Sequence, residues 1–165
     1  MMPDPPGVLF VCLGNICRSP LAEGIFIHKL QSHAALAAKL KIDSCGTGNW
    51  HVGNPADRRS IAVARKHGIT LPSRARQFDR KGDPARFGLM LAMDRSNRDD
   101  LLANGASPDQ VRLMLSFDPE LASLDADSEE LDVPDPYYGG PEGFDHVYSM
   151  LDRACDGLLK SISGG

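Results

Sequence analysis

The segment from Val8 to Pro20 runs from an apolar strand, through a short loop, into the start of a helix. Val8–Val11 is continuously apolar, as expected for a strand that is buried on both faces. Ser19 followed by Pro20 is the N-cap and first-turn signature of a helix, which we expect to extend from Pro20 to about Leu40. A strand joined this closely to a helix begins a β–α–β unit, and such units build parallel sheets with helices packed on them.

The rest of the chain repeats this alternation. Apolar runs bounded by turn residues predict three further strands, and cap residues and glycines around the segments between them predict three further helices. The predicted strands are 41–45, 87–93 and 111–117, and the predicted helices are 54–67, 94–103 and 143–162. We therefore predict an α/β fold with a parallel sheet covered on both faces. Ligands of such sheets bind at the carboxyl ends of the strands, where Cys12 lies.

The loop after the first strand has the composition of an anion-binding cradle. Its sequence is Cys12-Leu13-Gly14-Asn15-Ile16-Cys17-Arg18-Ser19-Pro20. Gly14 and Asn15 tolerate positive φ angles, so the backbone can curl until its N–H groups and the helix N-terminus face one centre. These donors and Arg18 favour the thiolate form of Cys12, and the planar Arg18 guanidinium can bind two phosphate oxygens at once. The loop therefore predicts phosphoryl transfer through a cysteinyl-phosphate.

Two simpler interpretations of this loop remain open from the residues alone. Cys12 and Cys17 could be small buried apolar residues at the end of a strand, which is the commonest role of a free cysteine. They could also be metal ligands, but a closed zinc site needs four ligands, and no second Cys or His pair has ligand spacing. We therefore expect no metal.

The loop resembles that of the low-molecular-weight protein tyrosine phosphatases, whose pattern Cys-x-Gly-Asn-x-Cys-Arg-Ser-Pro is matched at every specified position. The resemblance covers nearly the whole chain, from Gly7 to the last helix. Other segments that carry it are Asp43-Ser44, Trp50, Val52-Gly53, Pro55, Ala92-Met93-Asp94, Ser96-Asn97 and Val133-Pro134-Asp135-Pro136-Tyr137-Tyr138-Gly139. It implies a flavodoxin-like three-layer fold with a central, mostly four-stranded parallel sheet, no cofactor, and hydrolysis of phosphotyrosine.

The resemblance also implies a role for each residue of the site. Cys12 would be the nucleophile, Arg18 the phosphate clamp, and Asp135 the acid that protonates the leaving phenol and then the base that activates water. Without the family, an aspartate between two prolines reads first as a turn residue. The implied phosphate-binding residues are Leu13, Gly14, Asn15, Ile16, Cys17, Arg18 and Ser19; the implied pocket walls are Trp50, Tyr137 and Tyr138; Ser44 is the implied loop support.

Several of the implied pocket and loop-support residues also have simpler interpretations. From the residues alone, Trp50 could equally be a partly buried core residue, and Tyr137 and Tyr138 could belong to a loop packed on the surface. Many animal members have a histidine where this chain has Ser73, so the hydrogen bonds that support the loop are expected to differ there. The histidines are expected to be surface or structural residues rather than bases; they are His28, His33, His51, His67 and His146.

Length and charge fit one phosphatase domain over 1–165, with flexible ends at 1–6 and 163–165. The chain is 42% hydrophobic and 24% charged, which is ordinary globular usage.

A formal charge of −4 argues against nucleic acid and anionic membranes as partners. The acidic stretch 118–135 contains no Lys or Arg and is expected to be a solvated loop. Without a membrane span or signal peptide, and with a nucleophile that needs a reducing compartment, we expect a cytoplasmic monomer or weak dimer that acts on phosphotyrosine proteins.

Three other functions stay open beside tyrosine phosphatase. The protein-arginine phosphatases share the fold, and within the family a threonine at the position of Ile16 looks like the mark of the bacterial arginine phosphatases. Ile16 and the two tyrosines after Pro136 therefore favour the tyrosine branch. A thioredoxin-coupled arsenate reductase needs downstream relay cysteines, and none lies between Cys45 and Cys155. A non-catalytic phosphate-binding module has no use for the nucleophile, the clamp and the acid together.

The pair Cys12 and Cys17 also predicts a response to oxidation. A reactive thiolate is readily oxidised to sulfenic acid, and a second thiol in the same curled loop can capture it as a disulfide before irreversible damage. We therefore expect a Cys12–Cys17 disulfide that dithiols reduce. The alternative is that Cys17 only packs beneath the loop.

Overall fold

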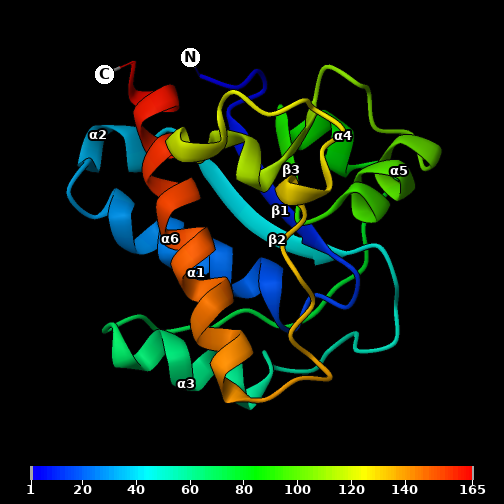
Figure 1. Cartoon of the computed structure of the whole chain (residues 1–165). Coiled ribbons are helices and arrows are strands. Elements are labelled where there is room, and N and C mark those ends of the chain that lie inside the picture. Colours follow the sequence, from blue (N-terminus) through cyan, green and yellow to red (C-terminus); the bar gives the residue numbers. More distant parts are fainter. Residues whose placement is uncertain (1, 165) are drawn as a thin grey trace.

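A parallel sheet of four strands forms the centre of the computed structural model, which describes residues 2–164 (Figure 1). The strands are β1 (Gly7–Cys12), β2 (Lys41–Gly46), β3 (Leu89–Ala92) and β4 (Val111–Leu113), in the order β2-β1-β3-β4. All neighbours are parallel, and Val8 pairs with Ile42 on one side and with Leu89 on the other. This is the strand order of a flavodoxin-like sheet, so the predicted fold class is confirmed.

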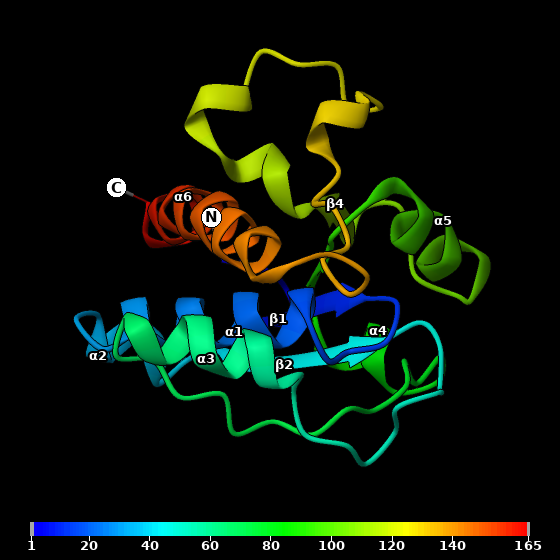
Figure 2. The same cartoon turned by 60° about the horizontal axis from the view of Figure 1, so that its bottom comes forward.

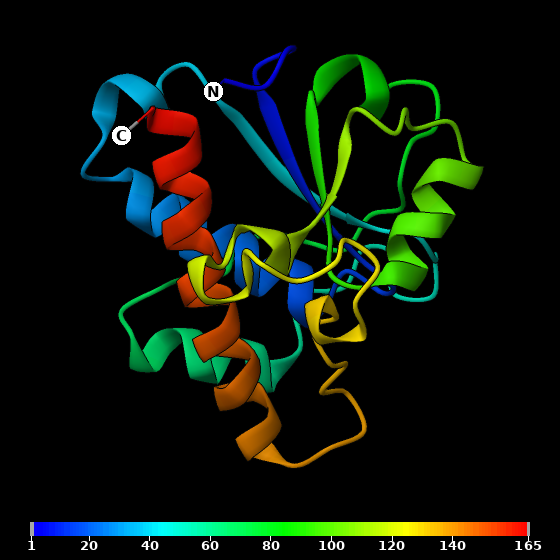
Figure 3. The ribbon, with the colours of Figure 1, turned by 45° about the horizontal axis from the view of Figure 1, so that its top comes forward.

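Helices cover both faces of this sheet. Figure 3 shows α1 (Arg18–Leu30) and α6 (Pro141–Ser163) on one side and α5 (Arg95–Ala103) on the other. A fourth helix, α3 (Arg58–Lys66), packs against α1 and α6 (Figure 2). Because β1 is central and covered on both faces, its residues Val8–Val11 are completely buried. The strand that carries Cys12 is thus the most enclosed part of the core.

Two predicted helices begin or end elsewhere than their patterns indicate. The first was expected to reach Leu40, but α1 ends at Leu30, and only the short α2 (Ala34–Ala37) follows before β2. None of the residues of α2 is fully buried, and only Leu36 packs partly against the core, which is too little contact to hold a longer helix together. The second was expected from Asn54, but Asp57 caps α3 by accepting a hydrogen bond from the Arg59 N–H.

The region between β4 and α6 also differs from the prediction. The apolar run 111–117 is a strand only over Val111–Leu113, and the rest is the 3-10 helix η1 (Met114–Phe117). The acidic stretch continues through η2 (Pro119–Leu121) and η3 (Glu129–Leu131). It is not uniformly solvated: Asp118 is completely buried and bonds to Arg153, and other carboxylates of the stretch pair with arginines of α5. A further short helix, α4 (Asp83–Arg86), precedes β3.

The chain ends that were expected to be flexible fall partly within the described residues. The carbonyl oxygen of Pro5 accepts hydrogen bonds from the N–H groups of Gly7 and Gly88, and that of Pro6 accepts one from Lys41. Ser163 is the last residue of α6. Residues 1 and 165 lie outside the described residues.

Candidate active site

The candidate site lies at the carboxyl ends of the strands. Cys12 is the last residue of β1, the loop 13–17 follows, and α1 begins at Arg18. Asn15 has a φ of 56°, as predicted, whereas Gly14 does not have a positive φ. Gly14 is small for another reason, because a Cβ there would lie 3.0 Å from the His51 ring. The loop is therefore curled around one left-handed residue, which asparagine tolerates.

The Cys12 sulfur accepts hydrogen bonds inside this curl. The N–H of Asn15 donates to it over 3.3 Å, and the Ser19 hydroxyl oxygen lies 3.0 Å from it. The Asn15 amide nitrogen donates to both Ser19 Oγ, at 2.8 Å, and Ser44 Oγ, at 2.9 Å. Ser44 in turn donates to Glu23 over 2.7 Å. A continuous set of hydrogen bonds thus joins Glu23 to Cys12, and Ser44, the expected loop support, lies within it.

Ser19 differs from its expected place in the helix. The sequence signature made it the N-cap of α1, but the N-cap residue is Cys17, whose side chain makes no capping hydrogen bond. Ser19 lies inside the first turn, completely buried, with its hydroxyl directed at Cys12. A serine before a proline therefore serves the thiol instead of the helix end.

Glu23 is the buried end of the hydrogen-bonded set. Burial raises the pKa of its carboxyl group, although the hydroxyls of Ser44 and Ser73 and the charge of Arg76 act in the opposite direction. Ser73, which stands where many animal members have a histidine, therefore also faces Glu23.

Arg18 is buried and held from two sides. Its Nη1 donates to the Asp94 carboxylate over 2.6 Å and to the Val133 carbonyl over 2.9 Å. Its Nη2 lies 3.8 Å from Asp135. Burial alone would lower the pKa of Arg18, but Cys12, Asp94 and Asp135 outweigh it and raise the pKa. The guanidinium is thus fixed as a cation beside the sulfur.

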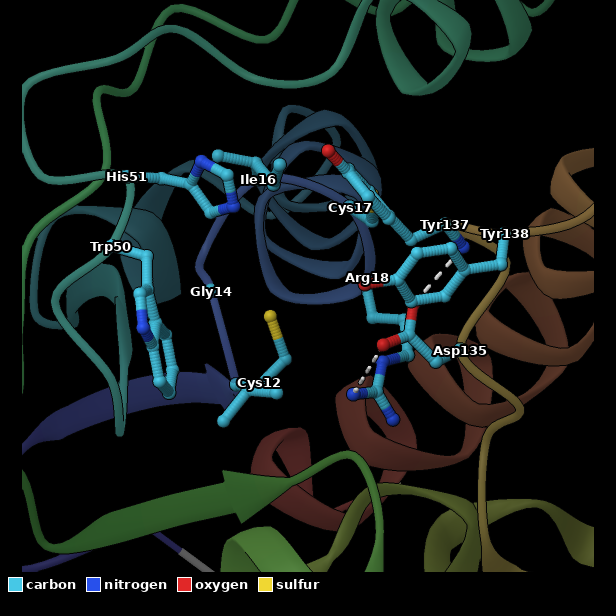
Figure 4. A pocket seen from close by; sticks show the side chains of 11 residues that line it. Cys12, Gly14, Ile16, Cys17, Arg18, Trp50, His51, Asp135, Tyr137 and Tyr138 are labelled. Atoms are coloured by element: carbon cyan, nitrogen blue, oxygen red, sulfur yellow. Dashed lines mark hydrogen bonds and ion pairs between the residues drawn. The ribbon is translucent and has the colours of Figure 1, made fainter.

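A cavity of about 430 Å³ opens above these groups. Figure 4 shows Trp50 and His51 on one side of it, Tyr137 and Tyr138 on the other, and the Cys12 sulfur between them. Its walls are Cys12, Leu13, Gly14, Ile16, Cys17, Arg18, Trp50, His51, Asp135, Tyr137 and Tyr138. All predicted catalytic and pocket residues therefore meet at one cavity. Of the predicted phosphate-binding residues, Asn15 and Ser19 lie beneath it rather than in its wall.

The aromatic walls stand at the mouth of the cavity. Trp50 is 70% exposed, so it is not a core residue. The rings of Tyr137 and Tyr138 meet edge to face at 4.9 Å, and His51 lies 6.1 Å from Tyr137. The N–H of Tyr137 donates to the Asp135 carboxylate over 3.1 Å, which ties the expected acid to the wall. A flat ring entering the cavity would pass between these aromatic groups.

The second thiol of the loop, Cys17, is buried and free. Burial, and then the nearby Asp57 and Cys12, raise the pKa of Cys17 well above its usual range, so this sulfur is a protonated thiol near neutral pH. The other two cysteines are also free and buried. Cys17 thus faces the cavity without competing with Cys12 as a nucleophile.

Three residues of the site were not assigned a role from the sequence. Asp94 anchors Arg18, Glu23 ends the hydrogen-bonded set, and His51 lines the cavity. Asp94 had a usable signal, because it is the N-cap of α5 directly after β3, the neighbour of β1. Glu23 and His51 had none, since their partners are distant in the sequence.

Between residues 2 and 164, no group of three or more His, Cys, Asp or Glu side chains could hold a metal ion. Over the same range, no helix combines the length and apolar character needed to cross a membrane.

Comparison with known proteins gives consistent matches. Residues 7–164 match the family model of the low molecular weight phosphotyrosine protein phosphatases. The low molecular weight protein-tyrosine phosphatase A of Mycobacterium tuberculosis is 41% identical over 157 residues, covering 95% of this chain and 91% of that protein. A crystal structure of a protein tyrosine phosphatase from Entamoeba histolytica superposes with a TM-score of 0.82 at 36% identity, covering 96% and 97% of the two chains. A Drosophila arginine phosphatase superposes with a TM-score of 0.80 at 29% identity, covering 93% and 96%.

Proposed function

The chain belongs to the low molecular weight phosphotyrosine protein phosphatase family, and on that premise we propose that Cys12, Arg18 and Asp135 carry out its reaction. The protein is a protein-tyrosine phosphatase, a hydrolase of phosphoric monoesters. The observation that carries the assignment is that these three side chains face one cavity, with Arg18 Nη2 only 3.8 Å from Asp135.

In the first step, the Cys12 thiolate attacks phosphorus. The S–P bond forms while the bond from phosphorus to the tyrosine oxygen breaks, and Asp135 gives its proton to that oxygen. The hydrogen bonds from Asn15 and Ser19 support a thiolate at Cys12. Asp135 suits the acid role because its exposed carboxyl group stands at the cavity mouth, where the leaving phenol departs.

In the second step, water attacks the cysteinyl-phosphate. Asp135, now ionised, takes the proton from water, the O–P bond forms, and the S–P bond breaks to return the Cys12 thiolate and release phosphate. Arg18 binds the equatorial phosphate oxygens in both steps and stabilises the charge that they carry. Its ion pair with Asp94 supports this role, because a guanidinium fixed in advance does not have to reorganise during the reaction.

The substrate class we propose is phosphotyrosine in proteins. The support is the aromatic mouth formed by Trp50, Tyr137 and Tyr138, which suits a ring between the phosphate and the peptide backbone. Ile16 at the cavity wall favours the same class over phosphoarginine. We also propose a cytoplasmic location, because a thiolate nucleophile and free cysteines suit a reducing compartment.

The test of this mechanism is Asp135→Asn. Turnover of phenyl phosphate should fall by roughly 10²–10⁴-fold, as expected for loss of a positioned general acid. With nitrophenyl phosphate, whose leaving group needs little protonation, the loss in the burst of phenol release should be much smaller. Asp127→Asn, an exposed carboxylate of the same acidic stretch, is the matched control.

Two results would reject the assignment. Equal losses across leaving groups of widely different pKa would mean that Asp135 only shapes the loop. Turnover by Cys12→Ser near that of the parent would mean that another group is the nucleophile.

A further inference from the structure

Arg59 lies at the start of α3, next to the loop that binds phosphate. Its Nε and Nη2 donate to the two oxygens of Asp57 over 3.1 and 3.0 Å, a fork that fixes the plane of the guanidinium. The N–H of Asp57 donates to the Ile16 carbonyl over 2.8 Å. Arg59 is thus attached, through Asp57, to the backbone of the phosphate loop.

The free edge of the same guanidinium holds the opposite wall of the cavity. Nη2 also donates to the Tyr137 carbonyl over 2.9 Å, and Nη1 donates to the Gly139 carbonyl over 3.2 Å. The guanidinium carbon lies 4.5 Å from the centre of the Phe144 ring and 5.6 Å from that of Tyr137. One side chain therefore joins the phosphate loop, the aromatic wall and α6.

We propose that Arg59 is a positioning residue that holds the wall segment 137–139 at a fixed distance from the phosphate loop, and so sets the affinity for aryl phosphates. This inference rests on the proposed function of the cavity. The distance between the phosphate loop and the wall decides whether an aryl phosphate whose phosphate group is bound by the loop also brings its ring against Tyr137. Arg59 itself lines none of the cavity and acts through Tyr137.

Tyr137 also packs against the hydrophobic core and its ring lies 6.1 Å from that of His51, whereas the remaining hydrogen bonds of the wall segment are local. Tyr138 is 94% exposed, and Gly139 and Gly140 follow it. The Gly139 N–H donates to the Pro136 carbonyl, and the Tyr137 N–H donates to the Asp135 carboxylate. Both hydrogen bonds lie within the same turn. Such local bonds hold the shape of the turn but not its distance from the phosphate loop. Arg59 provides two hydrogen bonds that cross this distance.

Arg58 gives a matched control for the charge of Arg59. It is the preceding residue of α3 and is exposed, and its side chain makes no hydrogen bond or close ion pair within residues 2–164, although its charge helps to lower the pKa of Asp57. Loss of either arginine removes one positive charge near the cavity. Only loss of Arg59 releases the wall.

The experiment measures binding in a Cys12→Ser background, in which a bound phosphotyrosine peptide is not consumed. Calorimetry gives the dissociation constants of the peptide and of inorganic phosphate, which needs only the loop. With Arg59→Gln, the constant for the peptide should rise about tenfold, the order expected for two charged hydrogen bonds and a ring contact, and that for phosphate less than about twofold. Arg58→Gln should change both by less than about twofold.

A double-mutant cycle with Tyr137→Leu separates positioning from a general structural effect. If Arg59 acts through the Tyr137 wall, Arg59→Gln should weaken peptide binding by less than about threefold once the ring is gone. Equal rises for peptide and phosphate, no change for either, or an undiminished effect in the Tyr137→Leu background would overturn the proposal. If Arg59→Gln does not fold, Arg59→Lys replaces it, with an expected rise of about threefold for the peptide alone.

Failure of the proposed function would be recognised separately. If Cys12 were not the nucleophile, the Cys12→Ser background would release phosphate from the peptide during the titration. The Arg59 comparison would then be repeated with a non-hydrolysable phosphonate peptide.

Discussion

At the scale of single residues, the side-chain amide of Asn15 holds the hydroxyl groups of Ser19 and Ser44 in place. Both N–H bonds of the Asn15 amide are used, one on Ser19 Oγ and one on Ser44 Oγ. When Cys12 is ionised its sulfur has no proton to give, so Ser19 Oγ, 3.0 Å away, is the donor of that pair. The Asn15 N–H lies 3.3 Å from the same sulfur, so two donors face the atom that we propose as the nucleophile. The surroundings of Cys12 therefore depend on residues that lie outside the cavity wall.

Oxidation provides a prediction at this scale. Peroxide should inactivate the enzyme and a dithiol should restore it, whereas Cys17→Ser should recover clearly less because it cannot form the Cys12–Cys17 disulfide. Burial, Asp57 and Cys12 raise the pKa of Cys17, so its thiolate is scarce at neutral pH. Disulfide formation should therefore become faster as the pH rises.

The measurement is activity recovered after a timed peroxide pulse, with the disulfide identified by peptide mass. Cys155→Ala, which removes a buried free cysteine of α6, is the control. Recovery of Cys17→Ser as complete as that of the parent would exclude a protective role for Cys17.

At the scale of helices and strands, the sequence predicts what local pattern determines. The continuous apolar run Val8–Val11 and the helix from Asp94 are found as predicted because their signals, burial on both faces and an N-cap, are local. The end of α1 depends on where tertiary contact ceases, at Leu30, which no pattern of helix-forming alanines reveals. Likewise, the apolar run after Val111 turns into η1 because its last residues pack under α6 rather than extend the sheet.

Gly157 gives a prediction for the packing of α6 against η1. A Cβ at Gly157 would overlap the Phe117 carbonyl at the end of η1. Alanine normally favours a helix over glycine by about 1 kcal/mol, but here the overlap should dominate and Gly157→Ala should lower the free energy of unfolding by about 2 kcal/mol.

Gly143 in the same helix is the matched control. A Cβ there would make only an ordinary contact, 3.7 Å from Pro136. Gly143→Ala should therefore leave stability unchanged or slightly raised when both variants are unfolded in urea. A neutral Gly157→Ala would show that α6 shifts away from η1 at little cost.

At the scale of the whole molecule, the buried carboxylate of Asp83 lies at the centre of a hydrogen-bond and ion-pair network in the connection between β2 and β3. Asp83 is completely buried and accepts hydrogen bonds from Arg76, Arg86 and the N–H of Asp79. Arg76 also pairs with Asp43 on β2. Burial alone would raise the pKa of Asp83, but Arg76, Asp79 and Arg86 outweigh it and lower the pKa. This network fastens the long connection to the sheet.

The lowered pKa fixes the sign of a pH effect. The ionised form of Asp83 stabilises the fold at pH values above the unfolded pKa of about 4, and this contribution disappears as the pH falls through the lower native pKa. Asp83→Asn should therefore cost about 3 kcal/mol at pH 7, since Arg76 and Arg86 both lose a buried partner, and less at pH 3, below the unfolded pKa.

Denaturant unfolding at both pH values checks this. Asp79→Asn, at a half-exposed carboxylate that pairs with Arg86 and accepts a hydrogen bond from the Lys81 N–H, is the control and should cost little at either pH. A cost for Asp83→Asn that is the same at pH 3 and pH 7 would mean that the loss arises from packing rather than from charge.

The residues that sequence reasoning left without a role show why part of the site could not be predicted. Cys12, Arg18 and the loop between them lie in one stretch, so their pattern can be read directly. Asp94 reaches Arg18 from the start of α5, and His51 reaches the cavity from the connection after β2, and both places depend on which strands become neighbours of β1. The resemblance supplied Asp135, but its contact with Arg18 spans more than half of the chain and follows from no local rule.

This division of the site has an evolutionary consequence. The proposed nucleophile and clamp, Cys12 and Arg18, belong to one short segment between β1 and α1, so a substitution of either is expected to remove the chemistry. The mouth residues Trp50, His51 and Tyr138 come from loops, which accept substitutions more readily than buried strands and helices. Selection could therefore alter the choice of substrate in small steps, one mouth residue at a time, and leave the groups proposed to transfer phosphate in place.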